Sequence, residues 1–223
     1  MPIATILDCA RCAKSAYGVD AIAGPGLTQA FYGDLASGFK GSFYQAAGGG
    51  GLGVICAFAG TEPNTWQDLL ADIGFAGPVG SLISPILAAL GGSQLARQLY
   101  GATEMARQAE NYAKQSRAPL VIVGHSLGGG LATMVACRLR LPCVTFSAPA
   151  TSQLGYRAPK GVSFRNVAVN GDFINATLRL GNRIGPTDEL DTGRVLLDAH
   201  SIDNTIAALS GGRYASLGST IAL

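Results

Sequence analysis

One serine lies between glycines in a motif that suits nucleophilic catalysis, Gly124-His125-Ser126-Leu127-Gly128. The four residues before it, 120–123, are apolar and predict a buried strand, and a helix is predicted from about residue 128. A sharp turn from strand to helix tolerates only glycine beside the serine, and it presents the hydroxyl at the carboxyl edge of the sheet. A glycine-rich phosphate loop is the competing interpretation, but the Lys of such loops is missing. We therefore predict that Ser126 is a nucleophile and that the N–H of Leu127 binds an oxyanion.

A serine hydroxyl is a weak nucleophile and needs a base, which an acid in turn orients. The chain has two histidines, and His125 adjoins the nucleophile, where the turn directs its side chain away from Ser126. We therefore predict His200 as the base, in the order nucleophile, acid, base that hydrolases with this turn follow. The alternative is that His200 is a polar residue near the start of the last helix.

The acid is expected at the end of a strand that follows the nucleophile. The run 164–169 predicts such a strand, and Asn170-Gly171-Asp172 follows it directly. We therefore favour Asp172, for which the alternative is an ordinary turn aspartate. Four acidic residues lie nearer to His200 in sequence, in a segment rich in loops that offers less rigid placement: Asp188, Glu189, Asp191 and Asp198. Asp198 is the main rival.

An oxyanion needs a second donor besides the amide that follows the nucleophile. A strand predicted over 53–59 leads into Gly60 and Thr61. Thr61 offers an N–H and a hydroxyl at the carboxyl edge of the sheet, so we predict it as this donor. Its alternative role, an N-terminal cap for the next helix, is compatible with the first.

These residues need a scaffold that brings the ends of several strands together. Strands are predicted at 42–47, 53–59, 120–123, 144–147 and 164–169, with a possible one at 194–197. Helices are predicted at 5–17, 65–73, 93–117, 128–139 and 201–210. Strands that alternate with helices predict an α/β fold, in which a mostly parallel sheet carries helices on both faces. We expect one domain over residues 1–223.

Composition excludes several classes of protein. The net charge of +2 argues against nucleic-acid binding, and a hydrophobic content of 48% argues against disorder. The five cysteines, which include Cys9-x-x-Cys12, are expected to be reduced thiols in the core rather than a redox or zinc pair. The run Gly48 to Gly53 fits a dinucleotide-binding pattern, but a strand follows it where that site requires a helix. We therefore expect neither a cofactor nor a metal.

Charged residues make up 13% of the chain, against about 25% in an average domain, and none occurs from Ile73 to Ala96. Five glycines and two prolines interrupt this stretch, so a membrane-spanning helix is not expected there. We expect no secretory leader, because the first residues carry no basic run and Asp8 interrupts their apolar stretch. We expect a cytoplasmic protein, or one exported by a specialised secretion route.

Several segments resemble, in order, the class 3 lipase family of fungal and plant lipases, which has the α/β-hydrolase fold. The segments are 57–61, similar to F-R-G-[ST]; 64–72, similar to a Trp-containing helix; 124–129, the nucleophile motif; 146–149, similar to F-G-[AS]-P; and 169–172, similar to N-x-D. The resemblance spans about residues 5–210. It implies a lipase or phospholipase that cleaves lipid esters with Ser126, His200 and Asp172.

The resemblance also implies a lid over the site, at about 62–91. Its substrate-facing residues would be Trp66, Leu69, Leu70 and Ile73. The charge-free stretch is then expected as an apolar rim or lid extension that meets a lipid substrate or a membrane surface.

Two departures from the family pattern are Ala59, where the family usually has Arg, and Thr65, where Asp is common. An esterase or thioesterase for soluble acyl substrates is the alternative enzyme. A lipid-binding module without catalysis is the alternative outside enzymes.

Overall fold

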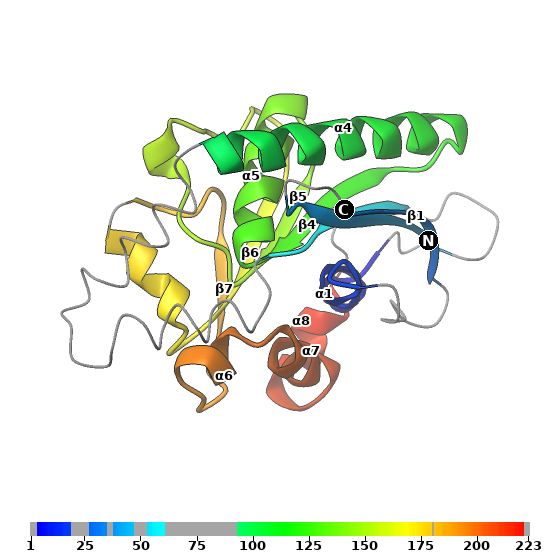
Figure 1. Cartoon of the computed structure of the whole chain (residues 1–223). Helices are drawn as coiled ribbons and strands as arrows, with labels where there is room; N and C mark the ends of the chain where they lie inside the picture. Colours follow the sequence, from blue (N-terminus) through cyan, green and yellow to red (C-terminus); the bar gives the residue numbers. More distant parts are fainter. Residues whose placement is uncertain are drawn as a thin grey trace.

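A single sheet forms the centre of the molecule (Figure 1). The computed structural model describes residues 4–18, 27–34, 38–46, 53–60, 93–179 and 181–220. Within these ranges the sheet has seven strands, which lie side by side in chain order. The strands are β1 Leu27–Asp34, β2 Lys40–Ala46, β3 Val54–Phe58, β4 Leu120–His125, β5 Cys143–Phe146, β6 Phe164–Val169 and β7 Thr187–Leu190.

Strand directions divide the sheet into two parts. The neighbours β1, β2 and β3 are antiparallel to one another, whereas β3 to β7 are all parallel. The parallel strands therefore end at one common edge, where ligands bind in α/β proteins. This edge receives the residues that follow β3, β4 and β6. The predicted α/β class is confirmed.

Helices cover both faces of the sheet (Figure 1). The α-helices are α1 Ile6–Ser15, α4 Ser93–Gln115, α5 Leu127–Leu139, α6 Leu196–His200, α7 Ile202–Ser210 and α8 Ala215–Gly218. Short 3₁₀ helices are η1 Ser152–Leu154, η2 Phe173–Arg179 and η3 Gly212–Tyr214. One buried cluster joins α4 and α5 to one face, and another joins α1 and α7 to the opposite face. Because both faces are covered, β3 and β4 are buried at every residue, as central parallel strands require.

Helix α1 is defined by its first turn and by its buried side. Thr5 accepts a hydrogen bond from the N–H of Asp8, and the Asp8 carboxylate accepts one from the N–H of Thr5. This reciprocal cap satisfies backbone donors that have no partner within the helix. Lys14, near the other end, pairs with Asp203 of α7, so the two helices on this face are also joined by charge.

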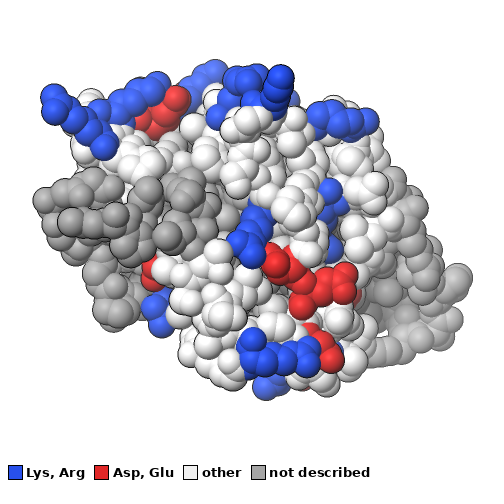
Figure 2. Space-filling view, turned by 180° about the vertical axis from the view of Figure 1, so that it is seen from behind, with Lys and Arg blue, Asp and Glu red and all other residues white. Residues whose placement is uncertain are grey.

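Helix α4 carries its charged side chains on the outside. Arg107 pairs with Glu104 at 2.7 Å and Lys114 with Glu110 at 2.8 Å. Figure 2, seen from behind, shows Lys and Arg gathered along the upper margin of the molecule, where α4 crosses in Figure 1. Exposed pairs of this kind stabilise a protein by less than about 1 kcal/mol, so α4 is held mainly by its apolar stripe. None of the helices in the described part of the chain is both long and apolar enough to span a membrane.

Two sequence predictions about strands need correction. The first strand, β1, was not predicted, and the strand considered at 194–197 is wrong because Leu196 begins α6. The last strand is instead β7, whose residues Thr187 to Glu189 are exposed or half-buried and only Leu190 is buried. As the last strand of the sheet, β7 lacks the apolar pattern of a central strand. The apolar residues that suggested a strand are not in the core, since Val195 is 66% and Leu196 41% exposed.

Candidate active site

Ser126 lies at the tight turn between β4 and α5. Its backbone has φ 57° and ψ −131°, a combination that side-chain-bearing residues rarely adopt. Such strain costs on the order of 1–3 kcal/mol and persists only where surrounding contacts hold it. One such contact is the hydrogen bond from the N–H of Ser126 to the carbonyl of Phe146 in β5, at 3.0 Å. The turn therefore has the strained geometry predicted from the glycine motif.

The glycines of the motif allow three backbone segments to meet. A Cβ on Gly124 would overlap the carbonyl of Gly128, and a Cβ on Gly128 would overlap the backbone at Phe58 and Ala59. These partners are backbone atoms, which cannot rotate away as a side chain can. Glycine is therefore required on both sides of the serine for α5 to start this close to β3 and β4.

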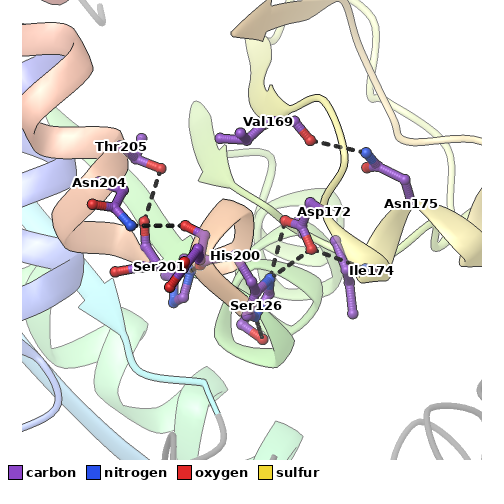
Figure 3. Close-up of polar contacts among 12 residues, drawn as sticks. Ser126, Val169, Asp172, Ile174, Asn175, His200, Ser201, Asn204 and Thr205 are labelled. Carbon is purple, nitrogen blue, oxygen red and sulfur yellow. Dashed lines mark hydrogen bonds and ion pairs between the residues drawn. The ribbon is translucent and has the colours of Figure 1, made fainter. Parts of the chain in front are cut away.

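His200 lies between Ser126 and Asp172 (Figure 3). Its Nε2 is 2.8 Å from the Ser126 Oγ, and its Nδ1 is 3.0 Å from each carboxylate oxygen of Asp172. A carboxylate only accepts, so Nδ1 carries the proton and Nε2 is left to accept one from the serine. The ring of Phe173 packs against the His200 ring, with centroids 4.7 Å apart. The structure thus brings together the three residues predicted as nucleophile, base and acid.

The loop after β6 holds the Asp172 carboxylate in place. Gly171 has φ +83°, which glycine adopts without strain, and a Cβ there would lie 2.6 Å from the carbonyl of Arg194. Asp172 Oδ1 also accepts the N–H of Ile174 at 2.9 Å (Figure 3). The N–H of Leu196 donates to the carbonyl of Gly171 at 2.7 Å. This last bond links the loop that carries the acid directly to the helix that carries the base.

The rival carboxylate does not hold this position. Asp198 lies in the first turn of α6, where it is exposed to solvent. Asp188 lies in β7 and pairs with Arg165 at 2.6 Å. Of the carboxylates considered from the sequence, Asp172 is the one for which the structure gives a hydrogen bond to His200.

Arg183 supports the acid loop, and the sequence pattern did not single it out. It donates to the carbonyl of Ala148 and to the side-chain oxygen of Asn175, each at 2.7 Å. Asn175 in turn donates to the carbonyl of Val169 at 3.0 Å (Figure 3). Burial lowers the pKa of Arg183, while the nearby charge of Asp172 acts in the opposite direction. A lone Arg in a loop gives no local signal of this role, because its partners come from two distant segments.

Leu127, the predicted oxyanion donor, directly follows the nucleophile at the start of α5. Leu127 is the first residue of α5, so its N–H has no acceptor within the helix. Gly60, two residues after β3, lies so close that a Cβ on it would be 2.7 Å from the Ser126 Cβ. Thr61, the second predicted donor, lies outside the described residues. So does the predicted lid at 62–91, with Trp66, Leu69, Leu70 and Ile73.

The Cys9-x-x-Cys12 pair lies inside the protein. Both side chains are fully buried in α1, and both thiols are free. Burial raises the pKa of each thiol, with the charge of nearby Asp8 adding to the effect. Thiols of this kind are unreactive, so the two residues act as small apolar groups of the core.

The fold and the strained serine turn define the class of protein: the chain has the α/β-hydrolase fold. Comparison with solved structures agrees. The Rhizomucor miehei lipase matches with TM-score 0.50 and 13% identity over 76% of this chain and 61% of its own. Lipase II from Rhizopus niveus matches with TM-score 0.53 and 15% identity over 83% and 79%. The mono- and diacylglycerol lipase from Aspergillus oryzae matches with TM-score 0.51 and 16% identity over 96% and 91%.

The family follows from sequence. The Tle-like phospholipase domain family matches residues 15–158, which is more than half of the chain. The chain belongs to this family, and its fold is that of class 3 lipases. It spans about three fifths of the Rhizomucor miehei lipase. No curated protein matches it in sequence.

Proposed function

We propose that this chain hydrolyses carboxylic esters of lipids, with phospholipids as the first substrates to test. The observation that carries the proposal is the position of His200, which is within hydrogen-bond distance of both Ser126 and Asp172. The family supports a lipid ester as the substrate, because its name is that of a phospholipase domain. The proposed roles are those of a serine hydrolase triad.

In the first half of the reaction, Ser126 Oγ attacks the ester carbonyl carbon while its proton moves to His200 Nε2. His200 then gives this proton to the departing alcohol, and the acyl group remains on the serine. In the second half, His200 takes a proton from a water molecule that attacks the acyl carbon. The bond from that carbon to Ser126 Oγ then breaks, His200 returns the proton to Oγ, and the fatty acid leaves. Asp172 keeps the proton on His200 Nδ1 and stabilises the imidazolium that forms in each half.

The negative charge that develops on the carbonyl oxygen needs donors in fixed positions. The N–H of Leu127 is one, and we propose Thr61 as the second. Removing one such donor costs roughly 3 kcal/mol of transition-state stabilisation in other serine hydrolases. The proposal for Thr61 rests on the sequence and on the closeness of Gly60 to the nucleophile.

The proposed function also includes a lid over the nucleophile and the base. Ser126 is 1% exposed and His200 5% exposed. We propose that the segment at 62–91 is the lid that opens at a lipid surface, with Trp66, Leu69, Leu70 and Ile73 turned toward the substrate.

The experiment has two parts. A fluorophosphonate probe should label the wild-type protein at Ser126 and should leave Ser126→Ala unlabelled. The wild type is then assayed on phospholipid vesicles, a diacylglycerol emulsion, and a short soluble ester. Release of fatty acid from phospholipid supports the proposal, and release from the glyceride alone would make the protein a glyceride lipase. Cleavage of the soluble ester alone would support the esterase alternative, and equal labelling of Ser126→Ala would refute the catalytic role.

A further inference from the structure

The imidazole of His125 takes no part in the proposed reaction, yet it is buried at the centre of the site. Side chains alternate between the two faces along a strand, so His125 follows Val121 and Val123 onto the face of β4 that α1 covers. Its Nδ1 is 2.7 Å from the Tyr17 hydroxyl. Its Nε2 is 2.8 Å from the backbone carbonyl of His200.

These two partners define the protonation state of His125. A carbonyl only accepts, so Nε2 must carry the proton, and Nδ1 then accepts the hydroxyl proton of Tyr17. Burial lowers the pKa of His125 to about 3, and the charge of His200 acts in the same direction. The hydrogen bond to the His200 carbonyl and the charge of Asp172 act in the opposite direction but are weaker. The imidazole is therefore neutral, with one donor and one acceptor, at any pH near neutrality.

His200 needs a fixed anchor because of the element that carries it. Helix α6 has five residues, and His200 is the last of them. The last carbonyl groups of a helix find no N–H donor within that helix, so they accept hydrogen bonds from groups outside it. His125 supplies one to the carbonyl of His200 itself. The rings of the two histidines also lie together, with centroids 4.9 Å apart.

We propose that His125 is a positioning residue for the base. Its Nε2–H holds the main chain of His200 at a set distance from Ser126, which is the next residue along the chain from His125. Tyr17, two residues after α1, donates to Nδ1 and so holds the ring in the orientation in which Nε2–H meets that carbonyl. The proposal rests on the proposed function of Ser126 and His200. The competing explanation is that His125 only fills space in the core.

Two substitutions of similar size separate these explanations. The amide nitrogen of glutamine reaches the position of the imidazole Nε2, whereas that of asparagine reaches only the position of Nδ1. His125→Gln keeps a donor for the His200 carbonyl, and His125→Asn loses it. A small displacement of a catalytic group can cost about 100-fold in rate, and we expect a loss of this order for kcat of His125→Asn, with KM little changed. His125→Gln should stay within about tenfold of the wild type.

The rate of fluorophosphonate labelling of Ser126 is a second measure, and it needs no identified lipid. It should fall in parallel with kcat for His125→Asn and recover in His125→Gln. Labelling of His125→Asn at the wild-type rate would overturn the proposal. The proposal would also be overturned if both variants lost kcat and labelling rate equally and in proportion to their loss of thermal stability. A packing defect alone would explain that result.

A third measurement is independent of activity. The chain has two histidines, so long-range ¹H–¹⁵N spectra of the labelled full chain give two readily separated imidazole patterns. We expect His125 to keep the neutral Nε2–H pattern between about pH 5 and pH 8. A wild-type His125 that is charged, or that carries its proton on Nδ1, would refute the proposal. Hydrolysis by wild type and by His125→Asn alike would remove the positioning role and leave the proposed function standing. A wild type that shows the Nε2–H pattern but resists every ester and the probe would remove the function instead.

Discussion

The buried imidazole of His125 should make the stability of the protein depend on pH. Its pKa in the folded protein is about 3, below its ordinary value of 6.5, because burial opposes the charged form. In the unfolded chain His125 takes up a proton as the pH falls below about 6.5, and the folded protein does not. The stabilisation from keeping this group neutral is therefore complete above about pH 6.5 and is lost as the pH falls from there toward 3.

The size of this effect follows from the two pKa values. At about pH 4.5 the protonated form of His125 exceeds the neutral form roughly a hundredfold in the unfolded chain. In the folded protein, where the pKa is about 3, His125 remains largely neutral at this pH. The loss relative to neutral pH is about 3 kcal/mol, from proton linkage at a single group. A typical domain has a total stability of roughly 5–15 kcal/mol, so the effect is large enough to measure.

The assay compares the wild type with His125→Gln, which cannot titrate at this position. Urea unfolding, followed by circular dichroism, gives the free energy of unfolding of each protein at about pH 7 and about pH 4.5. Other groups that titrate in this range are present in both proteins, so the difference between the two losses isolates His125. The wild type should lose about 3 kcal/mol more than the variant. Equal losses would show that the folded protein protonates His125 as readily as the unfolded chain does.

Three further changes test the site and the turn. Asp172→Asn should lower kcat about 10⁴-fold, because the amide no longer favours the productive tautomer of the base. Asp198→Asn should leave kcat nearly unchanged, and comparable losses of kcat in the two variants would contradict the assignment of Asp172 as the acid. Gly128→Ala should destabilise the protein by about 3 kcal/mol in thermal unfolding, because the added Cβ overlaps the backbone at Phe58 and Ala59. Gly211→Ala is the control and should show no such loss, because a Cβ there meets no atom within 4 Å. Ser126→Gly should be inactive but should need more urea to unfold than Ser126→Ala, because glycine relieves a backbone strain of about 1–3 kcal/mol at φ 57°. A glycine variant less stable than the alanine variant would show that the backbone at this position is not strained.

The nucleophile turn could be predicted from local sequence because its causes are local. The apolar run before Ser126 has to be a strand, and Gly124 and Gly128 are needed wherever a strand and a helix meet this closely. The same local logic predicted β6 and the loop that carries Asp172. Central elements of this kind are recognisable because burial on both faces imposes an apolar pattern on them.

Other features depend on contacts between segments that are far apart in the chain. Whether Asp172 or Asp198 faces the base depends on how α6 docks against the loop after β6, and the bond between Leu196 and Gly171 sets that docking. The role of His125 likewise depends on partners 108 and 75 residues away, namely Tyr17 and His200. No pattern within a window of ten or twenty residues records such contacts. They arise because packing on a common sheet brings the ends of distant elements to one edge, where hydrogen-bond geometry then selects among side chains that the sequence alone leaves equivalent.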